Sequence, residues 1–508
     1  MNVRAFPLRW PALVAIVVAT VLLTPASAGA KKPPVGGGGF STTSTYVKNY
    51  ADVLNGAEYS LTPEDVQATP DGGWTALALT SNGPSWLVKA SAVGAPQWQE
   101  EVGCLNGAPG DYADEVSLQQ TSDGGYVLAG GTIGCGSGSD CPELSGLQCG
   151  LIERLTSAGA VVWARVYSAG ADGTGIWQIR QTSDGGFVAV GTATDVNHNT
   201  GALILKLDGL GNVQWQRELG PTGTNQAYFY GVQQTADGGY VAAGELDTGT
   251  NSSYGLPWIS VLAVKFDASG NVSWQRSFND SGPTGVTATE HVNAIVQTSD
   301  GGYALGGDWN SATYPGTCCQ GALLLKLTAA GAIQWQQAYS GGVDCSLGYG
   351  CIGGSVYSLH QTADGSYLLA GDSNVELGAE APLVPWLAKV DSSGALVWQE
   401  NDYQSLPSTG APLSEYFASS TLTATGPLAI GSTENYAIGR NELLGVQTDP
   451  NGNVGTCSQI HPASALSATN PGLAPLAPGL TTTSSTVSQS SSPAQVRATT
   501  GTATANQC

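Results

Sequence analysis

One phrase recurs along this chain and limits its fold more than any other feature. It reads Gln-Thr-Ser/Ala-Asp-Gly-Gly-Tyr, with small variations, and its aspartate returns every 52 to 64 residues. A seventh, degenerate copy lies at 421–431, where Thr-Gly-Pro replaces Asp-Gly-Gly. Such a period indicates a fold assembled from one repeated supersecondary unit. The aspartates of the six clear copies are Asp71, Asp123, Asp184, Asp237, Asp300 and Asp364.

A second phrase follows each copy of the first and reads Lys-Leu-Asp-x-x-Gly-x-x-x-Trp-Gln. Its tryptophan is present in six units and missing from the seventh copy at 447–454. A burial site between neighbouring units explains this recurrence better than a ligand contact, because an indole hides about 150–250 Å² of surface when it is buried. The tryptophans are Trp98, Trp163, Trp215, Trp274, Trp335 and Trp398.

Each unit is predicted to contain four antiparallel β-strands. In the third unit they are expected at 176–182, 186–192, 202–207 and 212–219, which are rich in β-branched, aromatic and apolar residues and are separated by breaks that contain Gly or Asp. The Asp-Gly-Gly triplet is a tight hairpin, because glycine adopts the positive φ that such turns require. Four strands repeated seven times predict an all-β fold, a seven-bladed β-propeller of four-stranded antiparallel blades.

Two contacts are expected to hold the ring and its units together. A ring must not leave an open sheet edge, and residues 46–50 resemble a fourth strand, so they are predicted to complete the degenerate seventh unit. The third strand of six units carries a cation that is expected to pair with the aspartate of the first hairpin. These cations are Lys89, Arg154, Lys206, Lys265, Lys326 and Lys389.

The ends of the chain differ in character from the repeats. Residues 1–30 combine Arg4 and Arg9 with an apolar run at 13–23 and small-x-small cleavage sites, which is the pattern of a secretory signal peptide. We therefore expect a secreted or cell-surface protein with no transmembrane segment once the signal is removed. A Gly/Pro-rich linker follows at 31–43, the propeller occupies 44–457, and the Ser/Thr/Ala/Pro-rich tail at 458–508 is expected to be disordered or extended.

The charge balance argues against one class of ligand. The formal net charge is −22 although only 11% of the residues are charged. An acidic surface repels phosphate backbones, so nucleic acid is not expected as a partner.

The cysteines are expected to form disulfides, because they are even in number and belong to an exported chain. Most fall in long loops around the second unit and at the junction of the fifth and sixth units. A metal site is the alternative, but exported thiolates usually oxidise. The candidates are Cys104, Cys135, Cys141, Cys149, Cys318, Cys319, Cys345, Cys351, Cys457 and Cys508.

The repeats resemble known propellers. The segments 181–187 and 206–215 look like the T-S-D-G-G-Y repeats of secreted bacterial and archaeal proteins, which carry no activity with them. The Asp-x-x-Gly-x-x-x-Trp part is also similar to the docking motif of quinoprotein (PQQ-like) propellers, and the vicinal pair Cys318-Cys319 is known from some of their dehydrogenases. The glycine pairs resemble kelch repeats. The chain departs from the quinoproteins in its unit number, which is seven rather than eight, and its few histidines form no ligand pair of the kind that the copper-radical oxidases among kelch proteins need. Neither a quinoprotein activity nor a copper-oxidase activity therefore follows from the fold alone.

The candidate site lies at the end of the blades that carries the long, varied loops, because function is commonly placed on variable loops over a rigid scaffold. The second strand ends in an acid in three consecutive units, at Glu245, Asp308 and Asp372, and equal repeat positions share one ring. This arc near the channel mouth offers oxygen ligands to a cation such as Ca²⁺ or an acid–base pair; otherwise it is a hydrated rim. Trp309 is a candidate stacking residue for a sugar or peptide.

The function favoured by these features is an extracytoplasmic binding or interaction scaffold whose long loops contact a protein or carbohydrate ligand at the cell surface. No catalytic residue and no cofactor beyond the Ca²⁺ alternative are predicted. Two alternatives remain open, a secreted enzyme (a quinoprotein-like oxidoreductase or a hydrolase that uses the acid arc) and a structural subunit of a cell-surface assembly.

Overall fold

The computed structural model confirms the all-β fold, since its described residues form strands and turns and contain no helix. It describes residues 45–51, 53–54, 57–81, 84–103, 112–133, 148–168, 173–195, 197–221, 226–250, 257–279, 287–313, 317–340, 354–374, 383–401, 416–435 and 440–454, and six short tail segments given below. The expected signal peptide and linker lie outside these residues. Within the described residues, no helix is long and apolar enough to cross a membrane.

The strands group into four-stranded antiparallel units of the kind that forms propeller blades, and we number these units along the chain. Unit 1 contains β4 (Leu61–Ala68), β5 (Trp74–Thr80), β6 (Ser85–Ala90) and β7 (Pro96–Val102). Unit 2 contains β8 (Tyr112–Gln120), β9 (Tyr126–Ile133), β10 (Cys149–Leu155) and β11 (Val161–Ser168). Unit 3 contains β12 (Gly173–Gln181), β13 (Phe187–Thr194), β14 (Thr200–Leu207) and β15 (Val213–Pro221).

The remaining strands follow the same order. Unit 4 contains β16 (Gln226–Gln234), β17 (Tyr240–Thr250), β18 (Pro257–Phe266) and β19 (Val272–Asn279). Unit 5 contains β20 (Thr287–Gln297), β21 (Tyr303–Thr313), β22 (Thr317–Leu327) and β23 (Ile333–Ser340). Unit 6 contains β24 (Gly354–Gln361), β25 (Tyr367–Asn374), β26 (Leu383–Val390) and β27 (Leu396–Asn401). Unit 7 contains β28 (Tyr416–Leu422), β29 (Pro427–Asn435), β30 (Arg440–Gln447) and β1 (Tyr46–Ala51), and β2 (Val53–Leu54) pairs with β3 (Ala57–Glu58).

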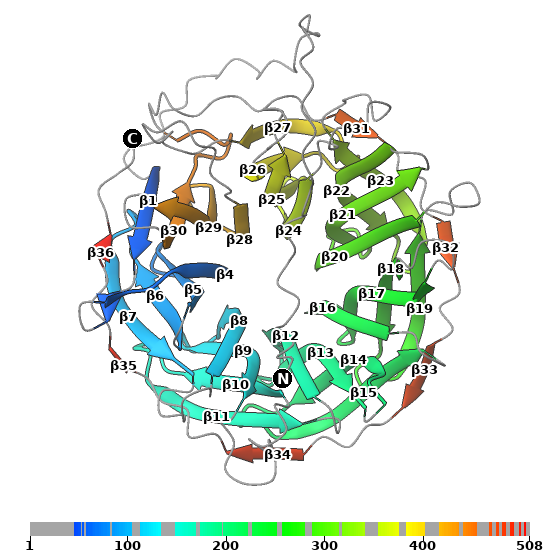
Figure 1. Cartoon of the computed structure of the whole chain (residues 1–508), viewed down its shortest axis with the longest axis horizontal. Helices are drawn as coiled ribbons and strands as arrows, with labels where there is room; N and C mark the ends of the chain where they lie inside the picture. Colours follow the sequence, from blue (N-terminus) through cyan, green and yellow to red (C-terminus); the bar gives the residue numbers. More distant parts are fainter. Residues whose placement is uncertain are drawn as a thin grey trace, which may run out of the picture.

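The units lie around a ring (Figure 1). The first strand of each unit faces the centre and the fourth lies at the circumference. The predicted strand at 46–50 is β1, which pairs antiparallel with β30 from Tyr46↔Gln447 to Tyr50↔Leu443, so the two ends of the repeat region share one sheet.

The first hairpin of each unit is built as its sequence predicts. In unit 3 the Thr182 amide donates to the Gly186 carbonyl at 2.9 Å, and Gly185 has φ = 78°. The Asp184 carboxylate accepts from the Gly186 amide at 3.0 Å and pairs with Lys206 of β14 at 2.9 Å. The expected ion pair is therefore confirmed, and it recurs in six units as Lys89–Asp71, Arg154–Asp123, Lys206–Asp184, Lys265–Asp237, Lys326–Asp300 and Lys389–Asp364.

The repeated tryptophan packs on the next unit, as expected. A Cβ added to Gly270 of unit 4 would lie 2.7 Å from the Trp215 ring of unit 3, so the indole covers this glycine closely. The same indole meets the edge of Tyr240 at 5.5 Å between ring centroids. In unit 7, which lacks the tryptophan, Tyr46 of β1 takes this place opposite Gln447, and a Cβ added to Gly94 of unit 1 would lie 2.6 Å from its ring. Tyr50 of the same strand donates to the Gly94 carbonyl at 2.8 Å. Apolar clusters between adjacent units, such as the one that contains Val190 and Leu262, complete the core.

The innermost strands are joined by hydrogen bonds from a side chain of one unit to the backbone of a neighbour. The Gln178 side chain, for example, accepts from the Val232 amide at 2.7 Å. Such bonds satisfy the inner edges of the sheets, which have no further strand to pair with. They connect Asp65 with Leu118, Ser117 with Ile179, Gln178 with Val232, Gln233 with Gln297, Asn293 with Val356, His360 with Ser420, and Ser419 with Val66.

Each innermost strand also contains a β-bulge at the same repeat position. A bulge inserts one extra residue and re-aims its side chain. The sequence pattern did not predict this feature, because one extra residue does not disturb the apolar run of a short strand. The bulged residues are Glu64, Val116, Trp177, Tyr230, Asn293, Tyr357 and Ala418.

The described parts of the tail are extended, and they pair with the outer strands. They follow the circumference in the direction opposite to the order of the units (Figure 1). The pairs are β31 (Ser467–Thr469) with β23, β32 (Ala474–Leu476) with β19, β33 (Leu480–Thr483) with β15, β34 (Ser488–Ser491) with β11, β35 (Arg497–Ala498) with β7 and β36 (Thr502–Ala503) with β1.

Candidate ligand site at the ring centre

The predicted acids of units 4 and 5 meet through a histidine that the sequence analysis did not select. The His291 Nδ1 donates to the Glu245 Oε1 at 2.7 Å, between β20 and β17. Asp308 of β21 lies directly opposite His291 in the strand register. The structure therefore groups Glu245 and Asp308 around one imidazole.

The charges around His291 decide its protonation state. Burial lowers its pKa, but the hydrogen bond to Glu245 and the negative charges of Asp308, Glu245 and Glu290 outweigh burial and raise the pKa to about 9. The ring is therefore an imidazolium at neutral pH and reinforces its bond to the Glu245 carboxylate.

An aromatic group continues from this ion pair into units 4 and 3. Tyr228 lies opposite Glu245 in the β16–β17 register, and its ring stacks on Tyr230 with a centroid distance of 6.1 Å and an interplanar angle of 6°. Tyr230 in turn meets Trp177 edge to face at 5.8 Å. Burial, together with the charges of Glu245 and Asp247, raises the pKa of Tyr228 to about 12, so its hydroxyl stays protonated.

The bulges explain why these aromatic residues come together. Trp177 and Tyr230 occupy the bulged position of units 3 and 4, and Tyr357 occupies it in unit 6. All three side chains are half-buried. We call Trp177, Tyr228 and Tyr230 the aromatic group.

Asp372 does not join this arrangement. Its carboxylate accepts from the Ser355 amide at 3.0 Å and from the Tyr357 hydroxyl at 3.0 Å, both within unit 6. Tyr357 meets Tyr416 of unit 7 edge to face at 6.2 Å. Asp372 thus supports a second, smaller aromatic pair.

Trp309 packs against the apolar cluster between units 4 and 5, and its Nε1 is buried. Its role as a stacking residue stays a prediction. Among the described residues, no three His, Cys, Asp or Glu side chains gather as a metal ion would require. Within those residues, Glu245, Asp308 and Asp372 therefore do not form a cluster that could hold Ca²⁺, and the Ca²⁺ contact stays a prediction.

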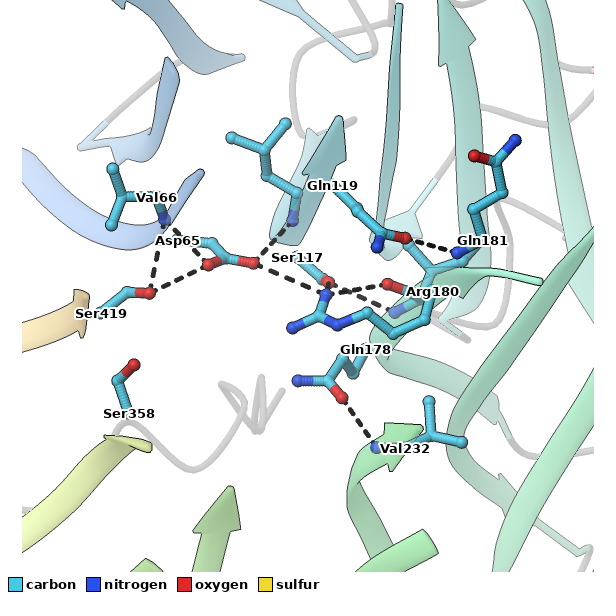
Figure 2. A network of polar contacts seen from close by, with 12 residues as sticks. Asp65, Val66, Ser117, Gln119, Gln178, Arg180, Gln181, Val232, Ser358 and Ser419 are labelled. Carbon is cyan, nitrogen blue, oxygen red and sulfur yellow. Dashed lines mark hydrogen bonds and ion pairs between the residues drawn. The ribbon is translucent and has the colours of Figure 1, made fainter. Parts of the chain in front are cut away.

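A second polar arrangement lies among the innermost strands (Figure 2). The Asp65 Oδ1 accepts from the Val66 amide at 2.8 Å and from the Ser419 hydroxyl at 2.9 Å, and its Oδ2 accepts from the Leu118 amide at 3.0 Å. Arg180 of unit 3 extends past unit 2 until its Nη1 is 4.0 Å from the Asp65 Oδ2.

The positive charge of Arg180 in unit 3 also affects the pKa of His360 in unit 6. Burial lowers the pKa of His360 in unit 6; its bond to the Ser420 carbonyl opposes that effect, and the Arg180 charge lowers the pKa further. The His360 Nε2 donates to the Ser420 carbonyl at 2.6 Å, so the neutral ring holds its proton on this nitrogen. The Arg180 side chain itself points from unit 3 toward Asp65 of unit 1, among the innermost strands (Figure 2).

Most of the cysteines that are predicted to form disulfides lie outside the described residues. Cys104, Cys135, Cys141, Cys345, Cys351, Cys457 and Cys508 lie outside the described residues, and of Cys318 and Cys319 only the backbone in β22 is described. Cys149 begins β10 and is disulfide-bonded. Disulfide formation by the other nine candidates stays a prediction.

No protein-family model and no curated protein matches the sequence. Among solved structures, the chain is similar to the polysaccharide lyase Uly1, with 10% identity over 80% of this chain and 98% of that chain and a TM-score of 0.35. It is also similar to a protein of unknown function from Bacteroides caccae, with 12% identity over 71% and 94% and a TM-score of 0.34. A third is the exotype rhamnogalacturonan lyase YesX, with 13% identity over 80% and 70% and a TM-score of 0.27.

Proposed function

We propose that the units close into a seven-bladed β-propeller. Two contacts between the last and first units support closure. β1 completes the sheet of unit 7, and Ser419 of unit 7 accepts from the Val66 amide of unit 1 at 3.4 Å. A closed ring leaves no end unit with an unpaired face, which explains why a degenerate seventh repeat is retained.

We propose that this propeller is an exported binding protein that recognises an oligosaccharide at the ring centre, at the end that carries the long loops. The observation that carries the proposal is the aromatic group placed beside the His291–Glu245 ion pair. Export and disulfide formation belong to the proposal and have their support in the N-terminal sequence pattern and the even cysteine count.

The chemistry of a sugar suits this arrangement. A sugar ring presents apolar C–H faces and a rim of hydroxyls, and ligand sites combine aromatic walls with a few placed polar groups. The half-buried Tyr228, Tyr230 and Trp177 supply flat amphipathic surfaces. Glu245 and Asp308 supply acceptors for hydroxyl protons, and the imidazolium holds the Glu245 carboxylate in place.

The test is binding of the mature protein to a glycan array, followed by calorimetry with the best oligosaccharide. Tyr230→Ala is expected to weaken binding by about tenfold or more, because central aromatic residues dominate binding energies. Leu210→Ala, in an exposed outer turn of unit 3, is the matched control and should bind as the wild type does. Failure of every glycan to bind, or equal binding by Tyr230→Ala, contradicts the proposal.

The alternative functions are separated by simple measurements on the purified protein. A quinoprotein-like oxidoreductase predicts quinone absorbance. A hydrolase that uses Glu245 and Asp308 predicts cleavage of the bound glycan, and its loss in Glu245→Gln. A structural subunit of a surface assembly predicts filaments whose amount rises with protein concentration.

A further inference from the structure

Arg180 is the residue that the proposed binding mode does not use. At its repeat position, four residues before the hairpin aspartate, the other units carry neutral side chains: Gln67, Gln119, Gln233, Val296, His360 and Thr421. Among these seven described residues, Arg180 alone carries a permanent positive charge. In a chain with a net charge of −22, this position needs an explanation.

The guanidinium is only partly engaged. Its Nη1 donates to the Ile179 carbonyl at 2.9 Å and approaches the Ser117 hydroxyl at 3.5 Å. Within the described part of the chain, the polar contacts of its side chain are all made by Nη1, and its Nε and Nη2 make no hydrogen bond. Since a guanidinium has five N–H donors in a rigid fork, its outer edge is open for a planar acceptor.

Asp65 does not form a close ion pair with Arg180. Its two oxygens already accept from three donors, namely the amides of Val66 and Leu118 and the Ser419 hydroxyl. The closest approach of Arg180 is 4.0 Å, the outer limit of an ion pair. Asp65 thus connects units 7, 1 and 2 by hydrogen bonds and accepts none from the Arg180 guanidinium.

Neutral polar groups surround the same space. Figure 2 shows Gln178 and Ser358 around the space that Arg180 and Asp65 face. The Gln178 oxygen is used by the Val232 amide, so its NH₂ group is the part that remains to donate. A carboxylate held by the fork of Arg180 would therefore meet a further donor in Gln178, beside an Asp65 carboxylate whose oxygens already accept from three donors.

We propose that Arg180 binds the carboxylate of an acidic sugar unit, so that the ligand of this propeller is a uronate-containing oligosaccharide. The inference rests on the proposed function and names its substrate class. Arg180 lies three residues beyond Trp177 on β12, toward the first hairpin and away from the long loops. Its equivalent in unit 4, Gln233, lies five residues beyond Tyr228, or ~15 Å along a strand. An oligosaccharide rather than a single sugar is needed to reach both the aromatic group and Arg180.

The experiment compares two ligands that differ only in charge. Trigalacturonate and its methyl ester are titrated into the wild-type mature protein, into Arg180→Gln, and into the control Arg217→Gln, whose arginine lies on the outer strand β15. The wild type and the control are expected to prefer the acid by about tenfold to a hundredfold, because a charge-assisted bond is at stake. Arg180→Gln should bind both forms with the affinity of the ester.

The outcomes are distinct. If the wild type binds acid and ester equally, or if Arg180→Gln keeps the preference, the inference is wrong while the proposed function stands. If neither form binds to the wild type or the control, the inference is wrong, and the proposed function fails as well only if no glycan of the array binds. Melting temperatures of the three proteins without ligand show whether Arg180→Gln is folded, and Arg180→Lys, which keeps the charge but not the fork, should lose part of the preference.

Discussion

At the scale of single residues, unit 2 departs from the other units by burying two carboxyl groups. Glu115 and Glu153 of unit 2 are both fully buried on the side that faces unit 1. The residue before the strand-three cation is Glu153 in unit 2 but apolar in the other five units that carry this cation, at Val88, Leu205, Val264, Leu325 and Ala388. Burial, and the neighbouring Glu115 charge, raise the pKa of Glu153 well above its usual value of 4.5.

This pair predicts a stability that depends on pH. Because the pKa of Glu153 is raised in the folded state, its protonated form stabilises the fold fully below about pH 4.5, and this contribution is lost as the pH rises. Glu153→Leu, which restores the repeat, is expected to increase the free energy of unfolding at pH 8 by on the order of 1–3 kcal/mol. Denaturant unfolding at pH 5 and pH 8 measures the effect. An equal change at both pH values would contradict this explanation.

Contacts within the repeated phrases could be predicted from the sequence, whereas several contacts between units could not. The Lys206–Asp184 pair and the packing of Trp215 were predictable, because the residues concerned recur at the same places of the two repeated phrases in six units. The His291–Glu245 bond and the position of the Arg180 side chain were not predictable, because each joins two different units and depends on side-chain directions that no short-range pattern records. Trp177 and Tyr230 were missed because a bulge re-aims them.

At the scale of elements, the contact between a tryptophan and a glycine turn connects neighbouring units. Gly270 has φ = 78° and lies under the Trp215 ring, so it needs both glycine's conformational freedom and its lack of a side chain. Gly238 offers a matched comparison, because its φ is 81° but a Cβ there would meet nothing within 4 Å.

The two glycines separate backbone strain from packing. Gly238→Ala is expected to cost about 1–2 kcal/mol from the left-handed conformation alone. Gly270→Ala should cost a further 1–3 kcal/mol or so, since the methyl group displaces the indole. Thermal unfolding of both variants, with tryptophan fluorescence as the readout, measures the difference. Equal destabilisation would mean that the indole does not seal this junction.

At the scale of the whole molecule, the chain treats its sheet edges in two ways. The inner edges are bonded by side chains of neighbouring units, and the outer strands β23, β19, β15, β11, β7 and β1 are paired by short strands of the tail. Exposed edges invite pairing with other molecules, so both devices favour a ring that does not associate through its edges. The sequence predicted that the tail is extended or disordered, but its lack of hydrophobic periodicity gave no sign of these backbone pairings.

Closure of the ring is the claim on which the ligand site depends, because the centre exists only if units 1 and 7 meet. Hydrogen–deuterium exchange of the mature protein tests it directly. The account predicts that the amides of residues 46–50 exchange as slowly as those of 443–447, their partners in the β1–β30 ladder. Fast exchange at 46–50 beside slow exchange at 443–447 would show that β1 is not seated in unit 7, and would contradict the closed ring.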